Sequence, residues 1–355
     1  MKNIFKILAV VALTTVVSLP SVIAGNDDRR GTAGAAELLI NPWARSTGWG
    51  SICTANSRGL DAFFSNVAGL SFVQKTEFSY TNTLYGGGRS GMLTGASINA
   101  FGLGQRISEK GVLAAYVMAM NFGDIPVTTE QSPDGGNGTF SPTYMNINVA
   151  YAHSFTASIH AGATVKIVTE GTSDVTATGF GIDAGIQYVT GGDDELKFGI
   201  SMKNIGPSFD FEGTGISVTT TNEYGNTMSV EYRKAAMELP TSLNIGASYD
   251  FLFDKWNQRL TVAGNFTSNA FLKDNFGVGL EYSLLDRFQL RTAYVYQTSI
   301  FDADMRTTFN TGLSAGASFN IPLSKDGSTS MVLDYSYRTC SPLRGTHAIG
   351  ATIKL

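Results

Sequence analysis

The feature that most constrains this chain is a two-residue alternation of apolar side chains with small or polar ones. It recurs from about residue 76 to the C-terminus and is most regular in the segments 145–151, 157–167, 180–188, 243–251 and 276–284. Because successive side chains of a strand point to opposite faces, each segment predicts a strand with one apolar and one small or polar face.

A soluble β-sandwich and a membrane β-barrel both produce such alternation. Many of these segments reach the ~9–11 residues that a tilted transmembrane strand requires, against ~5–6 in ordinary soluble sheets. The second face carries glycine, serine, asparagine and charged residues, which do not form a packed core. The apolar face is therefore predicted to contact lipid.

Composition agrees with a barrel. Only 15% of the residues are charged, whereas soluble domains carry about 25%. The mean hydropathy is nevertheless only +0.03. Beyond the N-terminus no apolar run approaches the ~20 residues of a spanning helix. In membrane barrels apolar and polar residues alternate along each strand, so hydropathy averaged over the sequence stays low although one face is apolar.

The expected fold class is all-β: a 14-stranded antiparallel transmembrane β-barrel with an N-terminal plug or hatch segment. An even number of strands places both termini on the same side, which is the periplasm in bacterial barrels. The predicted strands are 75–85, 92–105, 111–123, 143–154, 156–169, 176–190, 195–205, 241–253, 258–268, 273–285, 287–298, 308–321, 329–339 and 345–355.

The connections between these strands support the count. The turns on the predicted periplasmic side are short, and the longest connections, 124–142 and 206–240, fall on the other side together with 299–307. Short periplasmic turns and longer outer loops are typical of outer-membrane barrels. The short turns are 106–110, 153–156, 191–195, 254–257, 285–287 and 324–328.

Three regions are expected along the chain. Residues 1–24 read as a secretory signal peptide, with Lys2 and Lys6 before an apolar core and a cleavage site after Ala24. Residues 25–73 lack strand periodicity but are rich in apolar side chains, so they are expected to fold as a plug in the barrel or to dock on a periplasmic partner. Residues 74–355 form the barrel.

Ten titratable residues fall on the predicted inner face of the barrel. Their signs are mixed, which disfavours a strongly ion-selective pore and favours internal ion pairs packed against the plug. They are His160, Lys166, Asp183, Lys197, Lys203, Asp250, Glu281, Arg291, Asp334 and Arg338.

No pattern in the sequence indicates an enzyme. His153 is assigned to a turn and His160 and His347 to separate strands, so the three histidines have no metal-ligand spacing. Gly86-Gly87-Gly88 joins two strands, as in a hairpin and not in a phosphate loop. We therefore assign no catalytic, cofactor-binding or metal-binding residue.

Two further observations limit the partners. The formal net charge of −4 gives no indication of a nucleic-acid partner. Export would permit a disulfide between Cys53 and Cys340. Two distant cysteines do not establish one, and we expect both to be unpaired.

The N-terminal block Gly31–Gly50 (GTAGAAELLINPWARSTGWG), followed by Asn66-Val67-Ala68-Gly69-Leu70, resembles the signature of the PorV/PorQ family. These are outer-membrane barrels of Bacteroidetes, similar in architecture to the FadL long-chain fatty-acid transporters. Further matches lie at 122–127, 138–142 and 196–207. The chain has Asn66-Val67-Ala68 where the family usually has Asn-Pro-Ala.

The resemblance implies a fourteen-stranded barrel with an N-terminal hatch and a role in or near the type IX secretion system. PorV-like proteins cap the translocon channel there, bind the C-terminal signal domain of exported cargo, and pass it to a surface attachment complex. It implies an outer-membrane protein with periplasmic termini and no catalytic residue.

Two functions remain open. The first is protein interaction, in which loops 124–142 and 206–240 bind translocon subunits or cargo. The second is transport of hydrophobic small molecules through an apolar pocket between residues 25–73 and the inner wall, and then through a lateral opening. The resemblance favours secretion, and the small, polar inner wall disfavours a large apolar pocket. The loops carry Pro126, Pro133, Pro207, Pro240, Phe209, Phe211 and Tyr224.

Overall fold

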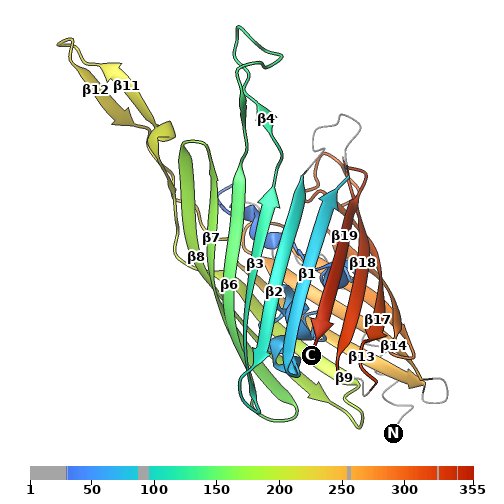
Figure 1. The fold of residues 1–355 in the computed structure, drawn as a ribbon. Helices are drawn as coiled ribbons and strands as arrows, with labels where there is room; N and C mark the ends of the chain where they lie inside the picture. The colour runs from blue at the N-terminus through green and yellow to red at the C-terminus, as the bar shows by residue number, and fades with distance from the viewer. Residues whose placement is uncertain (1–28, 30, 87–95, 254–256, 326–327, 342) are drawn as a thin grey trace.

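Fourteen long antiparallel strands form one closed barrel (Figure 1). The computed structural model describes residue 29 and residues 31–86, 96–253, 257–325, 328–341 and 343–355. The strands are β1 (Thr76–Tyr85), β2 (Ser97–Arg106), β3 (Gly111–Asn121), β6 (Thr143–Ser154), β7 (Ile159–Thr172), β8 (Val175–Thr190), β9 (Leu196–Ile205), β13 (Ser242–Phe253), β14 (Gln258–Asn269), β15 (Asn275–Leu284), β16 (Phe288–Gln297), β17 (Asn310–Pro322), β18 (Ser330–Cys340) and β19 (Thr346–Lys354).

Every long strand pairs with its neighbours along the chain, and the β1–β19 pairing closes the ring. Tyr80, for example, lies opposite Phe101 of β2 and Ala351 of β19. The predicted number and order of strands are confirmed, and their ends agree within a few residues. The predicted beginning of the second strand, the Gly87-Gly88 part of the glycine hairpin and the signal peptide lie outside the described residues.

Side-chain exposure follows the predicted alternation. Along β8 nearly every second residue is exposed, and the exposed set includes Phe180, Ile182 and Ile186. Asp183 and Gln187, which alternate with them, are buried in the barrel. The apolar outer face of the wall therefore contacts lipid instead of a protein core.

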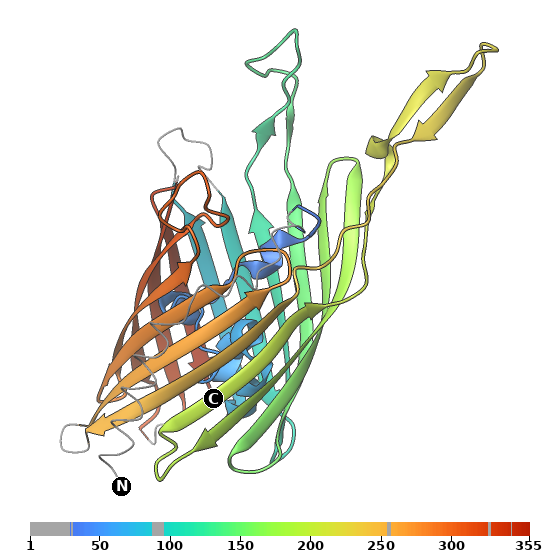
Figure 2. The same ribbon diagram turned by 180° about the vertical axis from the view of Figure 1, so that it is seen from behind.

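A compact segment of short helices fills part of the lumen (Figure 2), and we call residues 31–73 the luminal segment. Its Trp43, Leu60 and Leu70 are almost fully buried. Glycines in the wall permit this close approach, since a Cβ at Gly102 would lie 2.9 Å from the Trp43 ring. The helices are η2 (Ala36–Leu39), α2 (Ala44–Gly48), η3 (Gly59–Asp61), α3 (Ala62–Ser65) and η4 (Val67–Phe72).

None of the helices in the described part of the chain is long and apolar enough to cross a bilayer.

Two hairpins project from one end of the barrel, which we call the loop end (Figures 1 and 2). We call the opposite end, where the short connections lie, the turn end. The first hairpin is β4 (Ile125–Pro126) with β5 (Thr139–Phe140). The second connection contains β10 (Phe211–Glu212), η5 (Thr214–Ile216), β11 (Ser217–Thr221) and β12 (Thr227–Glu231).

One sequence assignment is wrong. His153 lies within β6, opposite Gly111, and not in the turn that follows. Its Nδ1 is 3.1 Å from the Tyr151 hydroxyl oxygen on the outer face. The turn begins later because β6 continues to Ser154, whose backbone nitrogen donates to Lys110 O.

Candidate functional site

A cavity of about 440 Å³ lies between the luminal segment and the loop-end half of the wall. Its volume is within the range of ligand pockets. Leu39, Ile40 and Phe64 of the luminal segment supply apolar surface. The facing strands β13–β16 supply mainly polar side chains, among them Asn244, Asn265, Thr267, Asn269, Asn275 and Gln297.

The cavity contains two cationic side chains. Lys203 Nζ donates to Phe64 O at 2.9 Å and lies 3.6 Å from the centre of the Phe64 ring. Arg338 lines the other side, and its Nε has no hydrogen-bond partner among the described residues. Glu37 is the one acidic residue in the described lining, so the cavity has a positive balance.

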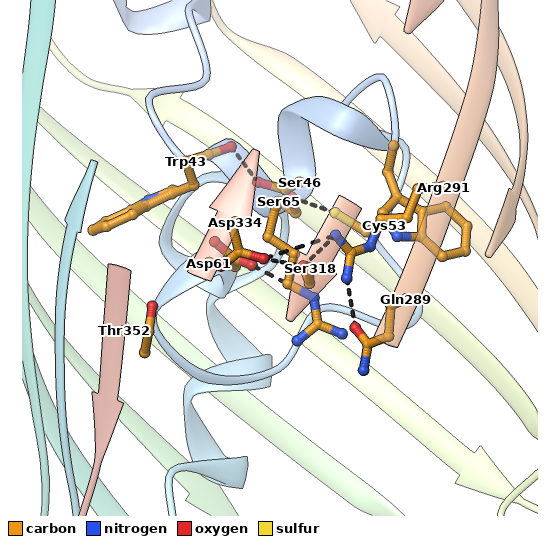
Figure 3. Close-up of polar contacts among 12 residues, drawn as sticks. Trp43, Ser46, Cys53, Asp61, Ser65, Gln289, Arg291, Ser318, Asp334 and Thr352 are labelled. Carbon is orange, nitrogen blue, oxygen red and sulfur yellow. Dashed lines mark hydrogen bonds and ion pairs between the residues drawn. The ribbon is translucent and has the colours of Figure 1, made fainter. Parts of the chain in front are cut away.

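Below the cavity, a buried ion cluster ties the luminal segment to β15, β16 and β18. Figure 3 shows the part of it around Arg291 and Asp334. Glu281 accepts from Arg291 Nε at 2.6 Å and from Trp49 Nε1 at 3.2 Å. Arg45 of α2 lies 3.8 Å from the same carboxylate. The Arg291 guanidinium also lies 3.8 Å from Asp334, which accepts a hydrogen bond from Ser318. These charges are therefore paired with one another inside the barrel.

Asp61 of the luminal segment belongs to the same neighbourhood, 3.9 Å from Arg45. Burial raises the pKa of Asp61 to about 7, and the nearby Asp334 carboxylate adds to this shift while Arg45 opposes it.

A second anchor joins the luminal segment to β8 and β9. Asn66 Nδ2 donates to Thr54 O at 2.9 Å and to Ile186 O at 3.0 Å, while its Oδ1 accepts from Ala68 N at 3.1 Å. The amide thus caps η4 and bridges to the wall with one side chain. The turn at Asn66-Val67-Ala68 forms without a proline, because the Asn66 side chain itself accepts from Ala68 N.

Wall side chains complete this anchor. Gln187 Nε2 donates to Thr54 O and Ser57 O, both at 3.2 Å, and Ser201 Oγ donates to Ser65 O at 2.8 Å. All of these bonds end on backbone carbonyls of the luminal segment. Its path through the turn-end half of the barrel is therefore fixed by hydrogen bonds on one side and by ion pairs on the other.

The barrel wall is irregular between β8 and β9. β8 has sixteen residues but β9 only ten, and the register shifts between the pairs Ile182–Ile205 and Ala184–Met202. Asn204 adopts a φ of 59° at this bulge. Its backbone nitrogen donates to Asp183 at 2.7 Å, and Asp183 pairs with Lys166 at 2.7 Å. The buried polar cluster stabilises the point where β9 leaves the wall.

Toward the loop end, the remainder of β8 has no β9 partner and is covered by the connection 206–241. β10 pairs briefly with β8, with Phe211 opposite Ala177. Phe209 and Leu239 pack against the wall here, with their side-chain atoms 3.3 and 3.4 Å from a Cβ built at Gly179. The wall is therefore closed here by side chains and not by a continuous strand pair. We call this region, residues 175–181 of β8 and the connection 206–241 that covers them, the wall interruption.

The wall interruption is also linked to the start of the luminal segment. Gly34 N donates to Glu238 O at 3.0 Å, and Glu238 N donates to Thr32 O at 3.2 Å. The Arg29 guanidinium pairs with the Glu238 carboxylate. The beginning of the luminal segment and the stem of the second hairpin therefore form one packed unit.

The predicted inner-face charges all point into the barrel. Nine of the ten are buried, and Arg338 is half-buried in the cavity. The prediction of internal ion pairs is confirmed for Lys166–Asp183, Lys197–Asp250 and the Glu281 cluster. Cys53 and Cys340 are both buried and unpaired, as expected. No group of side chains in the described ranges could hold a metal ion.

Neither a family model nor a curated protein matches the chain. Solved structures do match. The CymD monoaromatic hydrocarbon channel is 13% identical with a TM-score of 0.55, over 89% of this chain and 97% of that one. The toluene transporter TodX of Pseudomonas putida is 12% identical with a TM-score of 0.52, over 85% and 96%. A FadL homologue of Pseudomonas aeruginosa is 13% identical with a TM-score of 0.50, over 88% and 96%.

The fold is that of a FadL-like outer-membrane barrel. CymD is described as a channel and TodX as a transporter, but at identities of 12–13% these similarities show the fold alone. The FadL-like architecture expected from the sequence is therefore confirmed. What the cavity accepts has to be argued from this chain's own residues.

Sequence reasoning did not find the wall interruption or the anchoring role of Asn66. A signal for the first was present, because the predicted strand 176–190 is longer than its neighbour 195–205 and an apolar connection follows. The partners of Asn66 are backbone carbonyls of Thr54, Ile186 and Ile200, which no residue pattern encodes.

Proposed function

We propose that this protein conducts small hydrophobic molecules through the luminal cavity and sideways through the wall interruption. The observation that carries the proposal is a continuous apolar cluster between the two. Ile40 and Phe64 line the cavity and pack against the cluster that contains Phe209 and Leu239. The similarity to hydrocarbon channels supports the same conclusion.

A lateral route agrees with the energetics of an apolar solute. Removing apolar surface from water is favourable by about 25 cal/mol per Å², so a molecule entering the cavity is stabilised there and gains again in lipid. The straight path through the turn-end half would take it past buried ion pairs such as Glu281–Arg291. Leaving through Phe209 and Leu239 avoids those charges. On this proposal the luminal segment acts as a plug, and the loop end faces the outside of the cell.

Cross-linking the connection to β8 tests this route. We expect the variant Ala177→Cys/Phe211→Cys, with Cys53 and Cys340 replaced by serine, to lose uptake when oxidised. Residues 177 and 211 lie directly opposite each other in antiparallel strands, at a spacing that a disulfide can bridge. Uptake of toluene into proteoliposomes should fall to the level of protein-free vesicles and return on reduction.

The matched control is Ser248→Cys/Ala263→Cys in the same background. These residues are also opposite each other, but in strands that are paired along their whole length. Oxidation there should leave uptake unchanged. Full uptake through the oxidised 177–211 variant would contradict a lateral route at this place.

A second function, recruitment of secretion partners, is favoured by a different observation. The β11–β12 hairpin projects beyond the barrel (Figure 1) and has two unlike faces. Val218 and Val230 lie opposite each other on one face, where Tyr232 is 63% exposed. Isolated two-stranded hairpins are marginally stable in water. On this proposal a translocon subunit or a cargo domain of the type IX secretion system covers the apolar face.

The partner role is tested on the hairpin faces. We expect Val218→Ser/Val230→Ser/Tyr232→Ser to remove a co-purified translocon subunit or cargo domain that accompanies the wild-type protein out of native membranes, because it removes the apolar contact surface. Mass spectrometry of the purified complexes is the measurement. The control Thr219→Ala/Ser229→Ala changes the other face and should retain the partner. Recovery of the wild-type barrel alone from native membranes would exclude this function.

A further inference from the structure

The outer face of β1 and β2 carries a polar cluster where the wall is otherwise apolar. Asn82 of β1 lies directly opposite Asn99 of β2, and its Nδ2 donates to Asn99 Oδ1 at 2.9 Å. The Tyr80 hydroxyl donates to the same oxygen at 2.8 Å. We call Tyr80, Asn82 and Asn99 the amide cluster.

The amide cluster faces away from the lumen. The residues on either side of Asn82 and of Asn99 in the chain are all buried in the barrel. Because neighbouring residues of a strand point to opposite faces, the two amides point outward. Tyr80, on the same face, is 48% exposed, and both asparagines are half-buried. The cluster is therefore accessible from the membrane.

The depth of the amide cluster follows from strand geometry. The polar pair at the turn-end edge of this face is Thr76 with Gln105, whose side chains are hydrogen-bonded at 2.7 Å. Asn82 is six residues further along β1. At ~3.3 Å per residue and a tilt of ~40°, this is a rise of roughly 15 Å, whereas the apolar band of such barrels is ~25 Å tall. The cluster thus lies within the band, and Leu84, the next outward residue toward the loop end, is again apolar and exposed.

The amide cluster has hydrogen-bonding groups left over. Asn99 Oδ1 accepts two bonds, while the described residues supply no partner for Asn82 Oδ1 or for the Asn99 amide nitrogen. If both amides were turned over, the Asn82 nitrogen and the Asn99 oxygen would be free, so one donor and one acceptor remain in either case. Acyl chains supply neither, and polar groups in hydrocarbon are costly unless they find a partner.

We propose that this protein forms a two-fold dimer in the membrane through β1 and β2, in which the free donor of each amide cluster bonds to the free acceptor of the other. A second copy fits for a geometric reason. All copies insert in the same direction, so their clusters lie at the same depth, and a two-fold axis along the membrane normal brings the clusters together reciprocally. Phe101 and Ile349, both exposed beside the cluster, supply apolar surface around these bonds.

The dimer leaves the wall interruption free. β2 is separated from β8 by β3, β6 and β7 (Figure 1). A contact at β1 and β2 therefore does not cover Phe209 or Leu239, and the dimer is independent of the proposed transport.

Energy transfer between labelled copies in lipid vesicles tests the dimer. Donor and acceptor dyes are attached to Glu130→Cys, an exposed position in the first hairpin, with Cys53 and Cys340 replaced by serine. We expect transfer to decrease as lipid is added, because dilution separates the copies. Asn82→Leu/Asn99→Leu should need about tenfold less lipid for the same decrease, the effect of losing two hydrogen bonds within a membrane. Leucine suits a lipid-facing position, so the variant should keep the heat-modifiable gel migration of a folded barrel.

Thr292→Leu is the matched control. Thr292 also faces outward, on β16, but its hydroxyl donates to Ser314 O at 3.1 Å and needs no partner from outside the barrel. This variant should dissociate at the lipid content of the wild type.

Three results would overturn the dimer. One is transfer in the wild-type protein no greater than that of randomly distributed copies. Another is dissociation of the double variant at the wild-type lipid content. The third is a monomeric wild-type protein that retains a different membrane protein through Asn82 and Asn99 in native membranes, which would assign the amide cluster to that partner.

Discussion

Replacing Glu281 with glutamine is expected to lower the free energy of unfolding by about 3–5 kcal/mol, the usual effect of breaking a buried ion pair from one side. Glu281 lies within 4 Å of three guanidinium groups, those of Arg45, Arg259 and Arg291. Without its charge these cations are left to repel one another in a water-poor interior. Urea unfolding from lipid vesicles, followed by tryptophan fluorescence and gel migration, measures the change.

The matched control is Glu231→Gln, which breaks a pair on the exposed β12 strand. The Glu231 carboxylate is 4.0 Å from Lys234 and its side chain is 66% exposed. Such a pair contributes at most about 1 kcal/mol. Equal unfolding of Glu281→Gln and the wild-type protein would show that the ion cluster does not anchor the luminal segment.

Replacing Asn66 with alanine is expected to loosen the luminal segment without unfolding the barrel. The change removes the cap on Ala68 N and the bonds to Thr54 O and Ile186 O. At about 1 kcal/mol for each bond, local opening becomes easier by about 3 kcal/mol, which accelerates amide hydrogen exchange in residues 59–72 about a hundredfold. Hydrogen-exchange mass spectrometry on the protein in nanodiscs measures it.

A second readout follows from the position of this anchor in the lumen. Ion conductance across planar bilayers should rise in Asn66→Ala, because the segment that fills the turn-end half is less firmly held. Asn56→Ala is the control, since Asn56 lies in the same segment but its Oδ1 has no hydrogen-bond partner in the described structure. Exchange in residues 59–72 at the wild-type rate would exclude an anchoring role for Asn66.

The candidate site could be predicted from the sequence only in part. The alternation along each strand placed Lys203, Glu281 and Arg338 inside the barrel, because a two-residue repeat of faces follows from strand geometry alone. It could not show that Glu281 is paired while Arg338 Nε stays unpartnered in a cavity. That difference depends on which residues of the luminal segment lie beside each charge.

The wall interruption shows the same limit. The ends of the strands at residues 190 and 205 could be predicted, because turn residues end the alternation there. Leu239, more than thirty residues later, packs beside Gly179 and Gly181 of β8. This contact could not be predicted from the sequence. A contact so distant in the chain depends on how the connection folds back, and no local periodicity reports it.

The sequence by itself determined the barrel, its fourteen strands and which face of each strand is apolar. These properties follow from backbone geometry and from the transfer of apolar side chains into lipid, which act residue by residue. Only the tertiary structure decided what lies inside: the anchoring of the luminal segment by Asn66 and Glu281, the cavity above it, and the side-chain closure by Phe209 and Leu239. Those features arise where segments distant in the chain meet, and their energies depend on distances that the order of residues does not contain.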